Sequence, residues 1–407
     1  MVWLRFHSRV LFVSILSLVS PVVTSARDPK ESLRESSSPE LLVGMSTALT
    51  GPTAHLGLAV QAGVESAFEE FNASQSTLPR LRLVALDDGY EPSRTGPNMH
   101  QLIEQMGAVA ILGNVGAPCA VSAVPIANAT RTPLIGYVTG GSVLRKTPPD
   151  RYVINYRASL AEEAGALVRN LVEQASIAPD EIAFFTQRDT FGDSYFDSGI
   201  AELKRLGLAH PQFIIHSRYE RNTIAVQTAV SEILLASKPV RAVVIGGAGA
   251  PAEAFIRTMR QAGYNGILGA VSFVEASRLA ENLGDLGNDV IVTQVVPHVQ
   301  ESSPIVERFR RALGESHADM QESEIALEGY IIANLFCFAL SHIHGPIDRE
   351  SLADALLTLE DFDLGLETPL FLNDSQHQAC HTIWPSKLRQ GKVLPMQWKE
   401  LATGGAK

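Results

Sequence analysis

A glycine-rich loop that opens a helix is the first feature of this chain that could bind a ligand. Residues 113–127 (GNVGAPCAVSAVPIA) follow the apolar run 108–112, which is typical of a buried strand. Pro118 fits the first position of the following helix, because its missing N–H would be unpaired there in any case. The free amides at this helix start belong to Gly116, Ala117 and Cys119, and they would point toward an approaching anionic group.

A second loop of the same kind follows a short distance along the chain. Residues 136–146 (GYVTGGSVLRK) come after the apolar run 133–135, and their small and hydroxyl residues are Thr139, Gly140, Gly141 and Ser142. Two adjacent loops that expose hydroxyls and backbone N–H groups form a cradle for a carboxylate. The alternative is that both loops are ordinary strand-to-helix turns.

Other motifs that could support enzymatic chemistry are incomplete. Residues 247–252 (GAGAPA) match the G-x-G-x-x-A dinucleotide fingerprint, but the next strand ends GAVS and lacks the acidic residue that would hold the ribose; Glu275 comes later. Asp87 and Asp88 could form an acid–base pair, yet the adjacent Gly89 favours a role in shaping the turn. We therefore expect a glycine-rich turn and a structural carboxylate pair.

The sequence has no signature of a nucleophile, a phosphate loop or a metal centre. It contains no phosphate loop with lysine, no G-x-S-x-G and no H-E-x-x-H, and its three cysteines have no metal-binding spacing. His342 and His344 stand at a predicted helix end, where the terminal carbonyls are the expected partners. We expect a protein that is not an enzyme and that has no cofactor and no metal.

Apolar and amphipathic segments alternate in two series, which is typical of βαβ units and parallel sheets. The first series predicts strands at 41–49, 80–86, 108–112 and 133–138 with helices at 57–74, 93–106 and 118–130. The second begins after residues 152–156 and predicts strands at 181–186, 213–219, 241–247 and 267–272 with helices at 161–174, 193–206, 222–235 and 252–261. A strand at 290–296, a packed helix at 324–344 and short C-terminal strands follow. The pattern predicts two α/β halves of similar build.

Length and charge agree with an exported two-lobed protein. The 407 residues exceed one hydrophobic core, and the formal net charge of −11 disfavours nucleic acid and anionic lipid as partners. Basic residues precede the apolar run 10–19, which is too short to span a membrane, and small residues follow at 24–26. We predict a signal peptide over 1–26 that is cleaved and, without a nearby cysteine, not lipidated, then a flexible leader over 27–40.

Five motifs in register give the chain a family resemblance. They are LLVGMSTALTGPTAHLG, VALDDGYEP, AVAILGNVGAPCAVSAVPIA, FFTQRDTFGDSYFDSG and SEIALEGYIIAN. Together they resemble the periplasmic solute-binding proteins of the Leu/Ile/Val-binding type over about 41–398. The resemblance implies an α/β type I periplasmic-binding fold, in which two doubly wound parallel-sheet lobes are joined by three crossovers near 157–160, Pro297 and 368–372. Lobe 1 would comprise 41–158 plus 298–368, and lobe 2 would comprise 159–297 plus 369–400.

The resemblance also implies where a ligand binds. In the family, the ligand's carboxylate is held by the loops that match Val115, Gly116, Ala117 and Pro118 and, in the second cradle, Tyr137, Thr139 and Gly140. The second lobe contributes an aromatic residue at the position of Phe191. A further aromatic and an acidic residue, which hold the α-ammonium, fall on Gly249 and Ser272, while the aromatic lid falls on Leu56 and a hydroxyl residue falls on Ala117.

These departures from the family pattern leave the ligand open. A desolvated ammonium needs a counter-charge, which Asp189 or Glu275 could supply from a neighbouring position. Otherwise the ligand is a carboxylate or amide without the amino group. The smaller residues at Leu56, Ala117 and Gly249 imply a larger ligand or a degenerate site.

The function implied is that of a monomeric periplasmic receptor for an amino acid or a related small carboxylated compound. It would deliver this ligand to an ABC permease in the inner membrane. The alternative is a ligand-sensing protein that feeds a membrane kinase or chemoreceptor. A secreted enzyme is a third possibility, for which no catalytic constellation is found.

Overall fold

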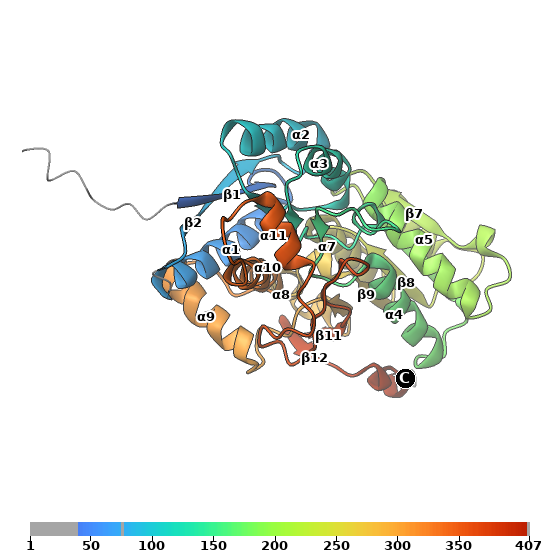
Figure 1. The fold of residues 1–407 in the computed structure, drawn as a ribbon. Coiled ribbons are helices and arrows are strands. Elements are labelled where there is room, and N and C mark those ends of the chain that lie inside the picture. The colour runs from blue at the N-terminus through green and yellow to red at the C-terminus, as the bar shows by residue number, and fades with distance from the viewer. Residues whose placement is uncertain (1–39, 75–76, 405–407) are drawn as a thin grey trace, which may run out of the picture. The chain divides into compact units, whose positions relative to one another are not determined.

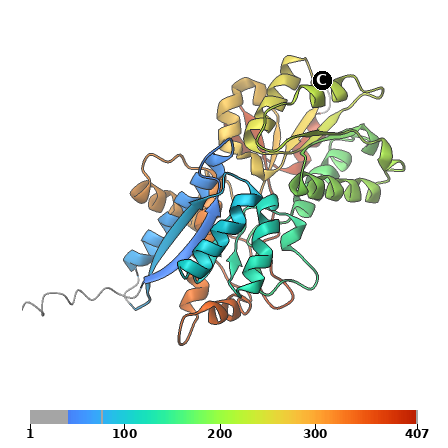
Figure 2. The same ribbon diagram turned by 90° about the horizontal axis from the view of Figure 1, so that it is seen from above.

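Two β-sheets organise the chain in a computed structural model that describes residues 40–74 and 77–404 (Figures 1 and 2). The predicted signal peptide, and the predicted leader except for Glu40, lie outside the described residues. The described part belongs to one unit, which spans residues 39–407. Its α/β architecture confirms the predicted class of fold.

The first sheet has five parallel strands in the order β2-β1-β3-β4-β5. The strands are β1 Glu40–Thr47, β2 Arg80–Asp87, β3 Ala110–Leu112, β4 Leu134–Ile135 and β5 Val153–Ile154. Glu40 pairs with Arg80 and Val43 with Ala110, so β1 lies between β2 and β3. Because all five strands are parallel, the two predicted cradle loops leave the same edge of this sheet.

Helices cover both faces of the first sheet (Figure 2). On one face α1, α9 and α10 pack together, and on the other α2 packs against α3. Their bounds are α1 Ala54–Ser74, α2 Pro92–His100, α3 Ala117–Ala129, α9 Pro304–Ser316 and α10 Glu324–Ser341; α2 continues as a π-helical turn, Gln101–Gln105, and α11 spans Arg349–Leu356.

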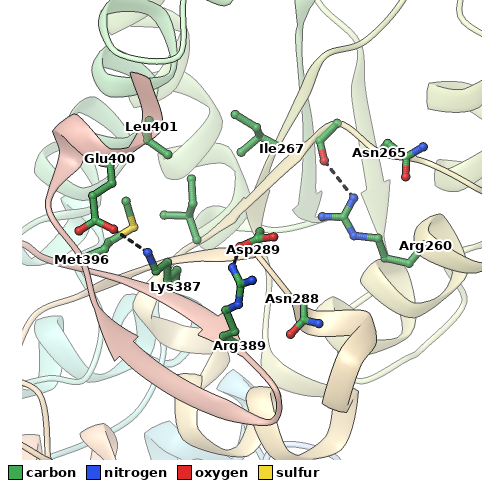
Figure 3. Close-up of a pocket in the computed structure, with 12 residues that line it drawn as sticks. Arg260, Asn265, Ile267, Asn288, Asp289, Lys387, Arg389, Met396, Glu400 and Leu401 are labelled. Atoms are coloured by element: carbon green, nitrogen blue, oxygen red, sulfur yellow. Dashed lines mark hydrogen bonds and ion pairs between the residues drawn. The ribbon is translucent and has the colours of Figure 1, made fainter. Parts of the chain in front are cut away.

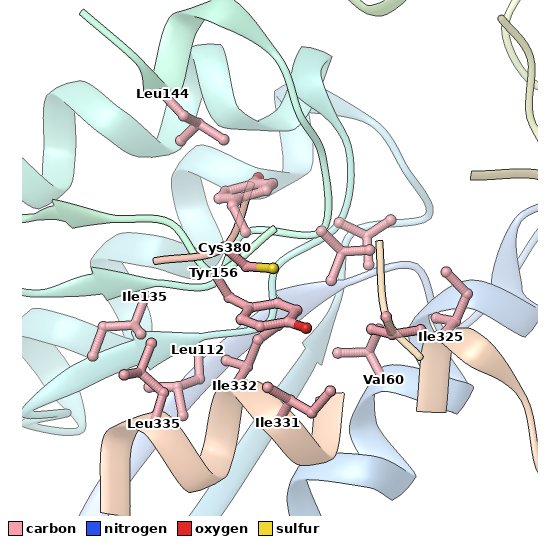
Figure 4. Packing of buried hydrophobic residues seen from close by; sticks show 14 of the residues in the cluster. Val60, Leu112, Ile135, Leu144, Tyr156, Ile325, Ile331, Ile332, Leu335 and Cys380 are labelled. Atoms are coloured by element: carbon pink, nitrogen blue, oxygen red, sulfur yellow. The ribbon is translucent and has the colours of Figure 1, made fainter. Parts of the chain in front are cut away.

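Helix α10 is the central core helix of the first lobe. Its Ile332 and Leu335 lie beside Leu112 and Ile135 of the sheet (Figure 4). Within the described residues it is the one helix long and apolar enough to cross a membrane, and most of it is buried in the protein. The prediction of a packed helix in this region agrees with this placement.

Two glycines bring α1 and α10 into backbone contact. A Cβ added at Gly63 would lie 2.0 Å from the carbonyl oxygen of Ala326, and one at Gly329 would lie 2.4 Å from that of Val60. A side chain at either position would force the two helices apart, since their separation is fixed by the core on both sides.

We expect Gly329→Ala to lower the free energy of unfolding by about 1–3 kcal/mol, because the added methyl group overpacks this contact. Gly314→Ala is the matched control: Gly314 is an exposed glycine of α9, and no other group lies within 4 Å of the position that an added methyl group would take. It should raise the stability by up to about 1 kcal/mol through helix propensity. Urea unfolding measures both, and equal effects of the two variants would contradict the close contact.

The second sheet has seven strands in the order β12-β11-β10-β9-β8-β6-β7. Strands β6 to β10 are parallel, and β11 and β12 join antiparallel at one side. The bounds are β6 Ile182–Gln187, β7 His216–Tyr219, β8 Ala242–Gly246, β9 Ile267–Ala270, β10 Ile291–Gln294, β11 Trp384–Arg389 and β12 Lys392–Pro395.

Strand β6 shows how this sheet is buried on both faces. Ile182 and Phe184 pack in the same core as α4 and α5, whereas Ala183 and Phe185 pack in a second core with α6, α7 and α8. The helices are α4 Leu160–Glu173, α5 Thr190–Arg205, α6 Gln227–Leu234, α7 Gly249–Gln261, α8 Ala276–Leu283 and the terminal α12 Leu401–Gly404. Short 3-10 turns occupy Ser142–Leu144, Pro179–Glu181, Pro211–Phe213, Ser272–Val274, Gly284–Gly287 and Trp398–Glu400.

The helix predicted from residue 222 begins only at Gln227, and Asn222 has a φ of 60°.

The chain crosses between the lobes in three segments. The crossings predicted near 157–160 and Pro297 fall in the segments that join β5 to α4 and β10 to α9. The third crossing lies later than 368–372, because the amides of Ala379 and Cys380 donate to Asn155 and Tyr156 of the first lobe. The segment 369–380 therefore stays with the first lobe, where Leu370, Leu372 and Cys380 are fully buried, and the chain enters the second sheet at Trp384.

The cysteines of the fold are unpaired and buried. Cys119, Cys337 and Cys380 are all free thiols, and burial raises the pKa of Cys380 to about 11. No disulfide forms between these three residues in the structure.

An ion pair joins the third crossing to α4, the helix that directly follows the first crossing. His381 Nδ1 lies 2.5 Å from Glu162 Oε1 on α4, and this hydrogen bond raises the pKa of His381 above its ordinary value of 6.5 although burial opposes the shift. A raised folded-state pKa contributes stability below pH 6.5, and this contribution is lost as the pH rises through the folded-state pKa. We expect His381→Ala to lower the melting temperature more at pH 6 than at pH 9. An equal loss at both pH values in a thermal scan would show that the pair is not ionic.

Candidate ligand cleft

The carboxyl edges of the two sheets contact each other through loops of both lobes. Gln187, at the end of β6, donates from Nε2 to the hydroxyl of Tyr90 at 3.2 Å. Glu91 accepts from Arg221 and from Asn222, each at 2.7 Å. These three hydrogen bonds hold the first lobe against the second beside the predicted site.

Asp87 and Asp88 organise the turn that carries Tyr90, as their neighbouring glycine suggested. Asp87 Oδ1 accepts from the amide of Gly89 at 2.9 Å, and Asp88 Oδ1 accepts from the amide of Tyr90 at 3.0 Å. Tyr90 has a φ of 62° and is fully buried. The carboxylates are thus engaged in the turn and in its neighbours, which leaves them no acid–base role that the geometry supports.

The first cradle loop has the predicted backbone form. Gly116 has a φ of 91° and precedes α3, which begins at Ala117 with Pro118 in its first turn, and Val115 pairs with Val138 of the second loop. The amide of Gly116, predicted to be free, instead donates to the carbonyl of Val138 at 3.3 Å; within the described residues, the amides of Ala117 and Cys119 have no hydrogen-bond acceptor. They remain donors for an anion at the start of α3.

The ring of Tyr90 covers Gly116. A Cβ added at this glycine would lie 2.0 Å from Tyr90 Cε2, so no side chain fits there while Tyr90 keeps its position. Sequence reasoning did not find Tyr90, because only the fold brings the turn after β2 against the turn after β3.

The second cradle loop packs against the first crossover. The carbonyl of Gly140 accepts from the amide of Leu160 at 2.9 Å, and a Cβ at Gly140 would lie 2.3 Å from that nitrogen. Thr139 is buried and its hydroxyl accepts from the amide of Gly141 at 3.3 Å. The hydroxyl of Tyr137 is buried, and no group among the described residues is its hydrogen-bond partner.

An aromatic row extends from the second lobe to the first. Phe191 is fully buried at the start of α5, and its ring centroid lies 5.0 Å from that of Phe273. The ring centroid of Phe273 lies in turn 6.0 Å from that of Tyr90. Phe191 was predicted from the resemblance, whereas Phe273 was missed although it follows the predicted Ser272. Together these rings form an apolar wall at the junction of the lobes.

Other residues of the protein pack closely around Leu56 and Gly249, two positions that the resemblance places in the ligand site. Leu56, near the start of α1, is fully buried in the first-lobe core. A Cβ at Gly249 would lie 3.0 Å from the carbonyl oxygen of Val274 and 3.1 Å from His55 Nε2. A small cavity of 70 Å³ adjoins Gly249 and His55.

Ser272 binds to a buried group of charged side chains. We call this group, which consists of Arg157, Glu163 and Glu328, the hinge charge cluster. Ser272 donates from its amide and hydroxyl to Glu163 at 3.0 and 3.1 Å, and Arg157 Nη2 donates to its Oγ. Arg157 also pairs with Glu163 Oε1 at 3.7 Å and with Glu328 Oε1 at 3.5 Å. All three charged side chains are at most 1% exposed.

The two neighbouring candidates for a counter-charge, Asp189 and Glu275, differ in how far their oxygens have partners. Asp189 caps α5 by accepting from the amide of Phe191 at 3.1 Å and also accepts from Gln187 at 2.6 Å. Glu275 lies 3.7 Å from His55 across the lobes, and burial raises its pKa to about 7. Asp189 is therefore engaged in the helix cap, whereas Glu275 Oε2 has no hydrogen-bond partner among the described residues.

A cavity of 620 Å³ lies outside the cleft, beside the antiparallel strands of the second sheet (Figure 3). Lys387 pairs there with Glu400 at 2.6 Å and Arg389 pairs with Asp289 at 3.1 Å. Lys387, Arg389 and Asp289 are partly or largely exposed, so water already screens these charges. Across residues 40–74 and 77–404, no group of three His, Cys, Asp or Glu side chains is placed to hold a metal ion.

The geometry defines a class of protein: two α/β lobes, joined at one side by three chain crossings, that oppose the ligand-accessible edges of their sheets. A family model described as "Periplasmic binding protein" matches residues 40–392. The chain belongs to this family, which confirms the resemblance read from the sequence.

Solved structures and a curated relative agree with this assignment. The chain is 42% identical to a possible leucine/isoleucine/valine-binding protein from Rhodopirellula baltica SH 1, with a TM-score of 0.87 over 90% of this chain and 98% of that one. A substrate-binding periplasmic protein from Ralstonia solanacearum is 26% identical, with a TM-score of 0.80 over 88% and 100%. An "Amino acid binding protein" of Pseudomonas aeruginosa PAO1 is 22% identical over 305 residues, which cover 71% of this chain and 79% of the relative.

The direct lobe contacts can be tested by charge reversal. Glu91→Arg places a cation against Arg221, so we expect the lobes to separate and the radius of gyration to rise in small-angle scattering without added ligand. Glu202→Arg is the matched control, because Glu202 pairs with Arg169 and Arg205 inside the second lobe. If both variants scattered like the wild type, the Glu91 contact would not hold the lobes together.

Proposed function

We propose that this protein is a periplasmic receptor that binds an amino acid or a related small carboxylated compound between its lobes and delivers it to an ABC importer. The observation that supports this most is the pair of amides, Ala117 and Cys119, that have no acceptor among the described residues at the start of α3 and at the junction of the lobes. A carboxylate there gains hydrogen bonds and the favourable end of the helix dipole. The protein binds its ligand without converting it.

The lobes divide the recognition between them. The first lobe supplies backbone donors and the hydroxyl of Thr139 to the carboxylate, and the second supplies the ring of Phe191 to the apolar part of the ligand. A ligand that contacts both lobes stabilises the closed arrangement by its difference in affinity for the closed and open forms. The names of the relatives support this class of ligand.

The cellular setting follows from the family and the predicted export signal. The mature protein is located in the periplasm, unlipidated and monomeric, and its partner is a permease of the inner membrane. An acidic chain with a formal net charge of −11 is suited to a small-molecule ligand and not to nucleic acid.

A thermal-shift screen of amino acids, amides, aromatic acids and dicarboxylates tests the proposal. A ligand present at 100 times its Kd adds about 2.7 kcal/mol to the free energy of unfolding and raises the melting temperature. The absence of any shift across all four classes would reject a receptor for small carboxylated compounds.

Replacing a cradle hydroxyl gives a residue-level test. We expect Thr139→Val to weaken binding of the best carboxylated compound about tenfold, because a hydrogen bond to a charged group contributes about 1.5–3 kcal/mol. Thr358→Val, at an exposed threonine after α11, serves as the control and should bind like the wild type. Calorimetric titration that finds Thr139→Val equal to the control would place the carboxylate elsewhere.

A further inference from the structure

The carboxylate of Glu328 is buried without a hydrogen-bond donor. It lies on α10, is 1% exposed, and neither Oε1 nor Oε2 has a hydrogen-bond partner within the described residues. Its nearest cation is Arg157, whose Nε lies 3.5 Å from Oε1. A carboxylate has about four acceptor positions, so this one lacks the donors that buried carboxylates normally receive.

Two other buried glutamates show what a satisfied carboxylate looks like in this fold. Glu163 accepts from the amide and hydroxyl of Ser272 and from Thr293 Oγ1 at 2.7 Å. Glu324, one turn before Glu328 on α10, accepts from the amide and hydroxyl of Ser277 at 3.2 and 2.9 Å. Glu328 is thus the exception among the three, although all are buried.

Burial and the surrounding charges together bring the pKa of Glu328 close to neutral pH. Burial raises its pKa to about 7, Glu163 adds to the rise, and Arg157 and Arg145 oppose it. Arg145 is itself bonded to four neutral oxygens, Gln378 Oε1 and the carbonyls of Thr139, Gly141 and Arg157. It therefore acts on Glu328 through the field and not through a hydrogen bond.

Further groups around the same point lack partners among the described residues. Arg157 Nε and Nη1 have no hydrogen-bond partner there, and neither does the fully buried hydroxyl of Tyr195 on α5, which lies within the field of Glu163. Shortening the 3.5 Å contact between Arg157 and Glu328 would satisfy one oxygen and leave the other without a donor. The hinge charge cluster adjoins the aromatic row, because Ser272 binds Arg157 while the next residue, Phe273, packs on Phe191 and Tyr90.

We infer that Glu328 receives a protonated amine of the ligand. The inference rests on the proposed function and narrows its ligand class to compounds that carry an ammonium as well as a carboxylate. An ammonium offers three N–H donors and a charge to the one carboxylate of the cluster that lacks donors, and Arg157 positions Glu328 from its other side. The counter-charge missing at Ser272 is then supplied by α10 of the first lobe.

If Glu328 binds the ammonium, ligand binding should release protons. A purely structural role of Glu328 would not produce this release. Where Glu328 carries a proton before binding, the arriving ammonium keeps its own protons and displaces that one to the buffer. Calorimetry near pH 7 in two buffers of different ionisation enthalpy should therefore report a fraction of a proton released per ligand bound. The same measurement on Glu328→Gln should report none.

The binding experiment compares amino acids with their deaminated analogues on the full mature protein. The probes are the standard amino acids and the matched carboxylic acids, for example L-leucine with 4-methylpentanoate. We expect the wild type to bind its best amino acid at least tenfold more tightly than the deaminated partner. Glu328→Gln should lose this preference while it keeps its affinity for the deaminated acid, and Glu328→Asp should keep part of the preference.

Glu324→Gln is the matched control, since it changes a buried glutamate of the same helix whose donors come from Ser277. It should keep both the preference and the proton release, and melting temperatures confirm that each variant is folded. Retention of the preference in folded Glu328→Gln would overturn the inference. Binding of deaminated acids alone would overturn it while leaving the proposed function intact, whereas no binding from either set would reject the proposed function and the inference with it.

Discussion

The parallel arrangement of both sheets is the constraint on which the site depends. Each parallel strand delivers its carboxyl end to the same edge, so the turns after β1 to β5 meet the turns after β6 to β10 along one junction. Groups far apart in sequence are brought together there, such as Tyr90 with Gln187 and Arg157 with Ser272. The antiparallel strands β11 and β12 lie at one side of the second sheet and take no part in this edge.

Burial of charge at the hinge is tolerated because the charges have partners. A buried ion pair gains little net stability over apolar packing, but removing one member typically costs about 3–5 kcal/mol. Arg157 contacts Glu328 of the first lobe and Glu163 of the second, so it couples the two lobes electrostatically at the point where the chain crosses. Glu163 accepts hydrogen bonds from Ser272 and Thr293, whereas Glu328 accepts none from the described residues. This difference distinguishes a structural carboxylate from one that is available to a ligand.

The sequence predicted the local parts of this structure better than the contacts between them. Alternating apolar and amphipathic segments located the strands and most helices, and Gly116 with Pro118 correctly marked the start of α3 within one residue. The helix from 222 was wrong at its start, since Asn222 turns toward Glu91 of the other lobe. The third crossing was displaced because Leu370 and Leu372 continue the first-lobe core, which a local pattern does not reveal. Tyr90, Phe273 and Glu328 had no local signal, because each gains its role from a neighbour that is distant in the sequence.

The packing of Tyr90 on Gly116 also links the evolution of two positions that lie in different turns of the chain. The ring leaves no space for even a methyl group at position 116, and the left-handed turn at Tyr90 fixes where that ring lies. A chain of this fold with a side chain at position 116 must therefore have a smaller residue at position 90, or a polar contact that fits the same gap. We therefore expect positions 90 and 116 to vary together among chains of this fold, because the turn after β2 and the loop that opens α3 share one space.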